Sequence, residues 1–381
     1  YTLMKVLLVG EYSHLHNSLK DGLQALGHEV FIIGRNDGFK NFPVDFPIEK
    51  KWDSGLLKKV KVILYKLSGF DISSFLTYRQ FLKFKKQCSG FDVVQLINEN
   101  SFECQPYFEK KIISHLLKNN QKLYLLSCGY DYLNVKYCFE NPSFKSVFPL
   151  YLNHKIDKKS FGNVLKFQEK AFYKLHQFIY KNSRGIIASD FDYHLPLLGN
   201  EKYLGLIPNP INIEKLPFEP LNFEDKIIIF HGINNDNYLK KGNDYFEKAL
   251  ETIKQKYASK IEVITVRSVP YSEYINLYNR CHILLDMVYA YDQGYNALEA
   301  MAKGKVVFTG AETEFTEYYN LSEKVCINAI SKVDCLVNEL SFLIENPDEI
   351  TAIGKRARAF IEEHHHYKKI AEKYIQKWNE N

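Results

Sequence analysis

The sequence lacks the long apolar segments, cysteine pairs and low-complexity stretches that define several classes of protein. Its uninterrupted apolar runs are short, as at residues 6–9 and 227–230, whereas a membrane-spanning helix needs about 20 apolar residues. Only 12 prolines and 19 glycines occur in 381 residues, and 46% of the residues are hydrophobic, which excludes disorder. Seven cysteines occur without a C-x-x-C pair, so we expect neither a zinc site nor a disulfide framework. We therefore expect a globular protein of the reducing cytoplasm.

Several catalytic signatures are absent as well. The sequence has no G-x-S-x-G, H-E-x-x-H or Walker A pattern, which argues against serine hydrolases, zinc proteases and P-loop nucleotidases. The first apolar run leads into Gly10 without a G-x-G-x-x-G fingerprint, which argues against a nicotinamide dehydrogenase. Three consecutive histidines at residues 364–366 would point in different directions from a helix, so we expect a solvated turn there and no metal site.

The charge is distributed unevenly along the chain. Residues 1–210 hold 29 Lys and Arg against 19 Asp and Glu, whereas residues 211–381 hold 21 against 26. Ten basic residues lie between Lys50 and Lys86 with only two acidic ones, and apolar residues recur there at helical spacing. Such a basic amphipathic segment either packs its apolar face on its own domain or lies on an anionic membrane surface, and the sequence leaves both open. We expect no nucleic-acid partner, because no RNP, KH or zinc-finger pattern is present.

Apolar runs alternate with helix-compatible stretches in both halves of the chain. The first half has expected strands at residues 5–9, 29–33, 92–97, 123–126 and 185–188, and the second half at 226–231, 261–266, 283–287 and 305–309. Between the halves, Pro208-Asn209-Pro210 forbids helix and favours an extended connector. The pattern predicts an α/β protein with two doubly wound, Rossmann-like domains, at residues 1–210 and 211–365, facing across a cleft, and a helix at 366–381 that packs back on the first domain.

Two elements of the second half carry the most chemical information. Gly294 stands where a loop enters an expected helix, and the free amides of a helix N-terminus suit a phosphate. Glu299, five residues on, is placed to accept hydrogen bonds from two neighbouring hydroxyls such as those of a ribose. Earlier, Gly232 follows an apolar run and Lys240-Lys241-Gly242 precedes the next helix, so that backbone and lysine can approach a diphosphate.

These elements together resemble the GT-B glycosyltransferases, in particular the large retaining family 4 (glycosyl transferases group 1). The resemblance is strongest over residues 226–310 and includes Lys241-Gly242 and the segment ending Glu-Ala-Met-Ala-x-Gly. It implies that Lys241 binds the donor diphosphate, that Glu299 binds the ribose and that the Gly294 helix start holds phosphate. We expect the donor site to comprise Gly232, Lys240, Lys241, Arg267, Tyr291, Gly294, Tyr295, Asn296 and Glu299.

The sequence departs from the family pattern at two points. Where the family has a first glutamate that contacts the donor sugar, this chain has Tyr291, and we expect Asp292 to reach the sugar instead. The arginine that often follows the first glycine is missing, and Lys240 or Arg267 are the expected substitutes for its charge. The D-x-D sequence Asp190-Phe191-Asp192 belongs to metal-dependent transferases of a different fold, so we expect no metal and no cofactor.

The resemblance also implies that the first domain binds the acceptor through the loops after its strands. On that side we expect Gly10, Tyr12, His14, Glu99, Gly129 and Asp131. His14 and Asp131 are the candidates to position or deprotonate an acceptor hydroxyl, with Glu99 as a third.

The expected function is transfer of a sugar, with retention of configuration, from a UDP- or GDP-type donor. The expected acceptor is a hydroxyl of a glycan or lipid-linked molecule in surface polysaccharide or glycoconjugate synthesis. We expect the protein in the cytoplasm, with peripheral attachment to the inner face of the plasma membrane. Two alternatives stay open, namely a non-catalytic GT-B-like partner subunit and a sugar-nucleotide epimerase.

Overall fold

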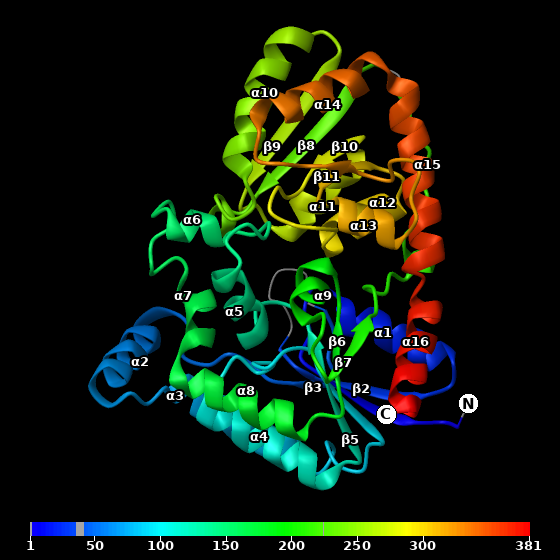
Figure 1. The fold of residues 1–381 in the computed structure, drawn as a ribbon. Helices are drawn as coiled ribbons and strands as arrows, with labels where there is room; N and C mark the ends of the chain where they lie inside the picture. The colour runs from blue at the N-terminus through cyan, green and yellow to red at the C-terminus, as the bar shows by residue number, and fades with distance from the viewer. Residues whose placement is uncertain (1, 36–41, 224) are drawn as a thin grey trace.

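The computed structural model of the protein describes residues 2–35, 42–223 and 225–381. Two α/β units lie one above the other, and the C-terminal helix runs from the upper, second unit back to the lower, first one (Figure 1). Each unit is a parallel sheet with helices on its faces, the arrangement that a strand-helix alternation produces.

The first unit contains a seven-stranded parallel sheet. Across the sheet its strands are β3 (Phe46–Pro47), β2 (Glu29–Gly34), β1 (Lys5–Val9), β4 (Val93–Leu96), β5 (Lys122–Ser127), β6 (Ile186–Ala188) and β7 (Tyr203–Leu206). Its helices are α1 (Leu15–Ala25), α2 (Gly55–Ser68), α3 (Ile72–Phe84), α4 (Pro106–Asn119), α5 (Tyr132–Glu140), α6 (Phe148–Leu152), α7 (Gly162–Leu165), the 3-10 turn η1 (Lys166–Gln168), α8 (Lys170–Asn182) and α9 (Phe191–Leu197). The central strands β1 and β4 are mostly apolar and almost entirely buried, because helices cover both faces of the sheet.

The second unit contains a five-stranded parallel sheet. Its strands, in order across the sheet, are β12 (Ile327–Asn328), β11 (Val306–Thr309), β10 (Ile283–Leu285), β8 (Ile227–Ile233) and β9 (Ile261–Arg267). The helical elements that follow the first unit are the 3-10 turns η2 (Ile213–Lys215) and η3 (Asn235–Asn237), and α10 (Asn243–Tyr257), α11 (Tyr271–Arg280), α12 (Tyr295–Ala302), α13 (Thr313–Tyr318), α14 (Val333–Glu345), α15 (Pro347–His364) and α16 (Tyr367–Glu380).

The chain crosses between the two units twice, and the two crossings are hydrogen-bonded to each other. The Ile211 amide donates to the His365 carbonyl at 2.7 Å, and the Tyr367 amide donates to the Ile211 carbonyl at 3.1 Å. His365 Nδ1 donates to the Asn209 carbonyl at 2.8 Å. The expectation of a solvated turn at this histidine is wrong, because His365 is buried and burial lowers its pKa to about 4.

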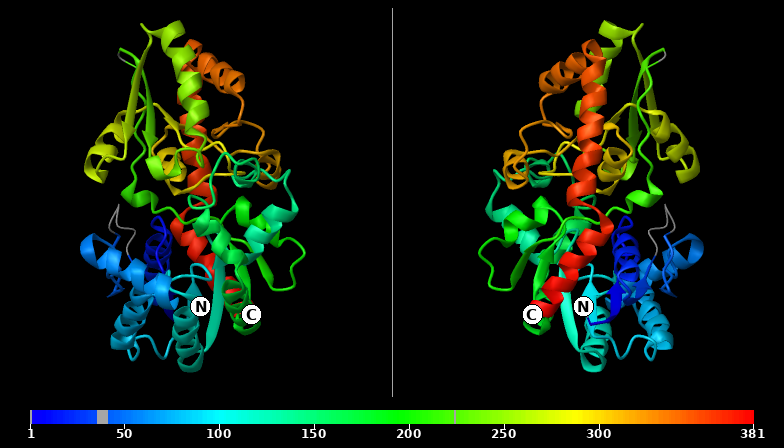
Figure 2. Two further views of the ribbon diagram at one scale, coloured as in Figure 1. Left: turned by 90° about the vertical axis from the view of Figure 1, so that its left-hand side faces the viewer. Right: turned by 90° about the vertical axis from the view of Figure 1, so that its right-hand side faces the viewer.

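After the second crossing, α16 packs along α1 of the first unit (Figure 2). Gly22 of α1 permits this close approach, since a Cβ added there would lie 2.4 Å from the Tyr367 carbonyl oxygen and 2.9 Å from the Ala371 Cβ. At the other end of α16, the Trp378 carbonyl accepts hydrogen bonds from Lys122 Nζ and the Tyr124 hydroxyl.

We expect the substitution Gly22→Ala to lower the free energy of unfolding by about 1 to 3 kcal/mol, because the added methyl group overlaps backbone that cannot move freely. Thermal denaturation followed by circular dichroism measures the effect. Gly162→Ala is the matched control, since a Cβ at Gly162 meets no heavy atom within 4 Å. Equal midpoints for the two variants would contradict this account of the α1–α16 contact.

The predicted class, two doubly wound parallel units, is confirmed. The strand boundaries differ in detail: β8 runs on through Ile233, and β10 ends at Leu285. Within the described residues, no helix combines the length and the apolar character that crossing a membrane requires.

Candidate active site

A cavity of about 210 Å³ lies where the two units meet. His14 of the first unit and Ile211 of the linker line it together with Tyr295, Glu299 and Lys303 of the second unit. The fold therefore brings together His14 and Glu299, which the sequence singled out in opposite halves of the chain. His14 lies in the loop that follows β1, and Glu299 lies on the helix that follows β10. In open α/β sheets, ligands bind at the carboxyl ends of the strands, to which such loops and helix starts belong.

His14 is held in place by its own loop. It is the residue before α1 and adopts a left-handed backbone conformation, with φ 85°. The buried Glu11 carboxylate accepts hydrogen bonds from the His14 amide at 2.9 Å and from the Asn17 amide at 2.8 Å. The His14 ring stacks on Phe42 with centroids 4.3 Å apart. These contacts fix the imidazole at the wall of the cavity.

On the opposite side, α12 presents its N-terminus and Glu299. Gly294 precedes the helix, and a Cβ there would meet no heavy atom within 4 Å, so the space beside the helix start is open. Glu299 is partly exposed on the second turn. Tyr295 has a different role from the donor contact that we expected, because it is buried and its hydroxyl donates to the Pro210 carbonyl of the linker.

Lys241 forms an ion pair with Asp286, a residue that the sequence did not single out. Its Nζ lies 3.1 Å from Oδ1 of Asp286, which directly follows β10 and is nearly buried. Asp286 also accepts from Asn296 Nδ2 at 3.3 Å and from Thr309 Oγ1 at 3.2 Å. Asn296 and Thr309 therefore fix Asp286, and Asp286 holds the lysine at the carboxyl ends of β10 and β11, where a diphosphate would need it.

The other expected phosphate ligands are engaged elsewhere. Lys240 Nζ donates to the Ser160 carbonyl of the first unit at 2.8 Å, and Arg267 pairs with Glu247 of α10. Gly232 lies inside β8 and not after it, which corrects the expected strand end. A Cβ at Gly232 would come 2.5 Å from the Tyr274 ring, so this glycine is required for packing against α11.

Tyr291, which replaces the expected glutamate, contacts the first unit. Its ring stacks on Phe144 with centroids 4.7 Å apart, and its hydroxyl oxygen accepts from the Lys145 amide at 3.3 Å. Lys145 Nζ in turn pairs with Glu312. The residue at the family's sugar-contact position is thus part of the contact between the two units.

Asp292 lies against the two aspartates of the D-x-D sequence, a contact that the sequence did not predict. Carboxylate oxygens of Asp190, Asp192 and Asp292 all lie within 4.8 Å of one another. The Phe191 amide donates to Asp292 at 3.2 Å, and the Tyr291 amide donates to Asp192 at 3.1 Å. The expectation that Asp292 turns toward a donor sugar is therefore not supported by its position.

Burial governs the ionisation of these three aspartates. Burial raises the pKa of Asp190 to about 7. Burial, followed by repulsion from the neighbouring carboxylates, raises the pKa of Asp192 and of Asp292 well above the usual range. In the part of the chain that the structure describes, this is the group of acidic side chains close enough to hold a metal ion, and it is equally suited to sharing protons.

Glu99 and Asp131, which were also expected on the acceptor side, are engaged by neighbouring groups of the first unit. Glu99 pairs with His176 and is buried, and Asp131 caps α5 by accepting from the Asn134 amide at 2.8 Å. Burial, with a smaller contribution from Glu99, raises the pKa of Asp131 to about 6. Neither lines the cavity that contains His14, so His14 is the better placed of the three candidate bases.

Gly10 and Gly129 shape the backbone of the acceptor side. Both have positive φ values, 88° and 81°. A Cβ at Gly10 would lie 2.4 Å from the Ile97 side chain, and one at Gly129 would lie 3.6 Å from the Tyr12 ring. Tyr12 borders a second cavity of about 670 Å³ at the carboxyl ends of β1 and β2, which Arg35, Lys50, Asp53 and Glu103 also line.

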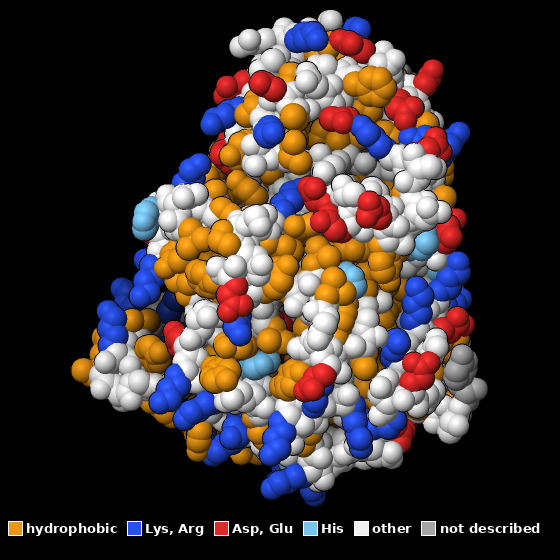
Figure 3. Space-filling view, viewed as in Figure 1, with side chains coloured by type: hydrophobic (Ala, Val, Ile, Leu, Met, Phe, Trp, Pro, Cys, Tyr) orange, Lys and Arg blue, Asp and Glu red, His pale blue; other side chains and the backbone are white. Residues whose placement is uncertain are grey.

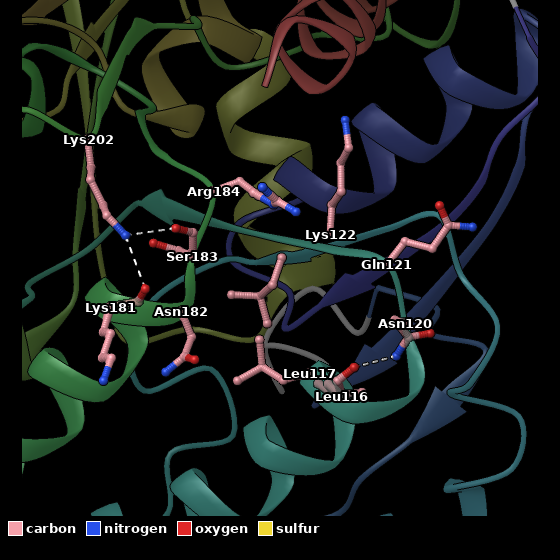
Figure 4. A pocket seen from close by; sticks show the side chains of 11 residues that line it. Leu116, Leu117, Asn120, Gln121, Lys122, Lys181, Asn182, Ser183, Arg184 and Lys202 are labelled. Atoms are coloured by element: carbon pink, nitrogen blue, oxygen red, sulfur yellow. Dashed lines mark hydrogen bonds between the residues drawn. The ribbon is translucent and has the colours of Figure 1, made fainter.

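A further hollow of about 490 Å³ lies at the opposite, amino-terminal ends of β5 and β6 (Figure 4). Lys202 extends into it, and its Nζ donates to the Ser183 carbonyl at 2.9 Å and to the Lys181 carbonyl at 3.3 Å. Lys202 therefore neutralises the carboxyl end of α8. This hollow lies at the amino-terminal edge of the sheet, whereas the ligands of a doubly wound domain bind at the carboxyl-terminal edge.

Comparison with known proteins identifies the architecture. Residues 240–376 match a family model described as glycosyl transferase-like. Sucrose-phosphate synthase of Thermosynechococcus elongatus superposes with a TM-score of 0.62 at 14% identity, over 99% of this chain and 98% of that chain. The chain has the GT-B fold. HepE of Anabaena, solved with UDP and glucose, gives a TM-score of 0.58 at 11% identity over 99% and 100% of the two chains.

A glycosyltransferase of Rickettsia africae shares the GT-B fold with a TM-score of 0.57 at 14% identity, over 100% of this chain and 99% of that chain. No curated protein matches the sequence. The resemblance to GT-B glycosyltransferases that the sequence predicted is confirmed by the family model and by the fold.

One site residue of this GT-B protein had a detectable sequence signal that we missed. Asp286 directly follows the apolar run at residues 283–285, and side chains at the carboxyl ends of parallel strands are the natural ligands of a doubly wound sheet. The contact of Asp292 with Asp190 and Asp192 had no such signal, because it joins loops that lie about one hundred positions apart in the chain.

Proposed function

We propose that this protein transfers a sugar, with retention of configuration and without a metal ion, from a UDP- or GDP-type donor to a hydroxyl of a glycan or lipid-linked acceptor. We place the reaction in surface polysaccharide or glycoconjugate synthesis at the cytoplasmic face of a membrane. The observation that carries the proposal is the cavity between the units, which combines Glu299 of the donor side with His14 of the acceptor side.

The proposed roles follow from charge and position. Lys241, oriented by Asp286, and the amides at the start of α12 would stabilise the negative charge that develops on the leaving diphosphate. Glu299 would accept hydrogen bonds from the ribose hydroxyls. His14 would orient the acceptor hydroxyl, and the leaving phosphate itself would assist same-face attack. Movement of the units about their paired crossings would exclude water and so suppress donor hydrolysis.

A specific set of contacts favours one alternative, a non-catalytic GT-B-like partner. Lys240, Arg267 and Tyr291 bind protein groups, and Asp292 lies in a carboxylate cluster. A donor would have to displace some of these contacts, which lowers its affinity by their free energy. Lys241, Gly294 and Glu299 keep positions suited to a donor, and for that reason we favour the transferase.

The test is a thermal-shift panel of UDP, GDP, ADP and CDP against the wild type and Glu299→Ala. A nucleotide at about 100 times its dissociation constant adds roughly 2.7 kcal/mol of stability. We expect UDP or GDP to raise the melting temperature of the wild type and to have little effect on Glu299→Ala. Glu251→Ala, which removes an exposed glutamate of α10, is the matched control and should respond like the wild type.

Two outcomes would decide against the proposal. Stabilisation by none of the nucleotides would favour the non-catalytic partner. Stabilisation that Glu299→Ala retains in full would move the donor site away from α12. Incubation with the donor that matches the stabilising nucleotide then distinguishes an epimerase, which releases a changed sugar nucleotide without an acceptor.

A further inference from the structure

Helix α2 leaves its apolar side chains in solvent. None of the residues of α2 is buried, although the helix is amphipathic. Leu56, Ile63 and Leu67 share one stripe of the helix and are 76%, 57% and 81% exposed. The structure therefore contradicts the alternative in which this face packs on its own domain. In Figures 1 and 2, α2 projects from the side of the first unit.

The charges around this stripe have one sign. Within α2 the ionisable residues that carry charge are Lys58, Lys59, Lys61 and Lys66, with no acidic residue. Lys61 pairs with Asp53 at 3.3 Å, and Lys58, Lys59 and Lys66 are exposed. The left-hand edge of the space-filling view shows hydrophobic and basic side chains together where α2 lies (Figure 3).

The exposed apolar surface continues past the end of α2. Phe70 is 41% exposed, and its ring lies 6.1 Å from that of Phe108 at the start of α4. The neighbouring Tyr107 is 62% exposed, and the ammonium group of Lys111 lies 4.6 Å from its ring centre. Aromatic and lysine side chains in this combination are typical of surfaces that sit at the boundary between water and lipid.

We propose that the patch formed by α2, Phe70 and Tyr107 docks on an anionic lipid membrane, with the mouth of the 670 Å³ cavity at the lipid surface. The lysines are complementary to acidic headgroups, whereas a second copy of the same basic patch would be repelled. Lys50 and Asp53 line the cavity, and Asp53 pairs with Lys61 of α2, so the cavity opens at the foot of the helix. If the protein is the transferase proposed above, a cavity at the lipid surface favours an acceptor that is anchored in the membrane.

Vesicle sedimentation tests the docking without any enzymatic reaction. We expect the wild type to bind vesicles of phosphatidylglycerol and phosphatidylcholine at low salt and to bind pure phosphatidylcholine poorly. Lys58→Glu/Lys59→Glu and, separately, Leu56→Gln/Ile63→Gln/Leu67→Gln should weaken binding by about tenfold or more. Lys248→Glu/Lys254→Glu on α10 and Leu198→Gln, which alter exposed residues elsewhere, should bind like the wild type.

The cavity mouth has its own reporter. Trp52 stands between Lys50 and Asp53, and the second tryptophan of the chain, Trp378, is buried. We expect brominated lipids to quench Trp52 fluorescence, and the variant Trp52→Phe to lose this quenching. Vesicle binding without quenching would overturn the placement of the cavity at the lipid surface.

Three results would overturn the docking itself. These are equal sedimentation of the α2 variants and the wild type, equal binding to neutral and anionic vesicles, and a dimer in solution that the α2 variants abolish. The nucleotide thermal shift is read on the same variants and should be unchanged, which shows that they are folded. For the wild type, a nucleotide shift without vesicle binding would mean that the docking fails and the proposed function stands. Vesicle binding without a nucleotide shift would mean the reverse.

Discussion

Replacing Lys241 with methionine is expected to lower the rate of nucleotide release from the donor sugar by about 10² to 10³-fold. Removal of one preorganised group that stabilises developing negative charge has an effect of this size. Lys241 is suited to that role because Asp286 holds its ammonium group at 3.1 Å, and Asn296 and Thr309 hold Asp286 in turn. The measurement is release of UDP or GDP from the donor by the purified protein.

The single substitution also leaves Asp286 without its cation in a nearly buried position, which itself destabilises the protein. The double variant Lys241→Met/Asp286→Asn removes that unpaired charge and separates the two effects. It should recover the melting temperature of the wild type without recovering the rate. Lys248→Met, on the exposed face of α10, is the matched control and should keep full activity.

A rate within threefold of the wild type for both Lys241 variants would contradict the assignment of this lysine to the diphosphate. The donor charge would then be neutralised by Lys240 or Arg267 after they release Ser160 and Glu247. The double variants Lys241→Met/Lys240→Met and Lys241→Met/Arg267→Met distinguish the cases, because the rate falls only when a cation that contacts the diphosphate is removed.

The substitution Asp192→Asn is expected to stabilise the protein by about 1 to 3 kcal/mol more at pH 8 than at pH 5. Each unit of pKa shift corresponds to about 1.4 kcal/mol. Asparagine removes one ionisable group from the cluster at the contact between the units and still offers an oxygen to the Tyr291 amide.

The direction follows from proton binding in the two states. An unfolded aspartate releases its proton near pH 4, whereas folding raises the pKa of Asp190 to about 7 and those of Asp192 and Asp292 further above the usual range. Between these pH values the folded protein binds more protons than the unfolded one, so its stability falls as the pH rises. The loss begins above about pH 4 and continues through pH 7.

Melting temperatures between pH 5 and pH 8, measured in EDTA, check this prediction. Asp236→Asn, at an exposed aspartate of the second unit, is the control and should follow the wild type. A wild-type stability that does not fall faster with pH than that of Asp192→Asn would refute the account. If Mg²⁺ or Mn²⁺ removes the difference between the two proteins at pH 8, the cluster binds a cation at that pH in place of protons.

The second unit illustrates how far local sequence determines this protein. The strands expected at residues 226–231, 261–266 and 305–309 and the helix near 243–257 agree with β8, β9, β11 and α10 to within two residues. The expected helix start at Gly294 and the position of Glu299 on the next turn are also as the structure has them. These features depend on short apolar runs, glycines and periodicity, which are local properties of the chain.

The partners of the site residues were decided only by the tertiary structure. Whether Lys241 is paired, whether Asp292 meets a sugar or two other aspartates, and whether α2 buries its apolar face depend on where distant segments come together. The sequence determined which side chains can ionise, donate a hydrogen bond or favour burial, and roughly where along each unit they lie. The packing of distant segments, including the docking of the two units through their paired crossings and α16, set the neighbours of these groups. Burial and charge pairing depend on those neighbours, because electrostatics and desolvation act through space and not along the chain.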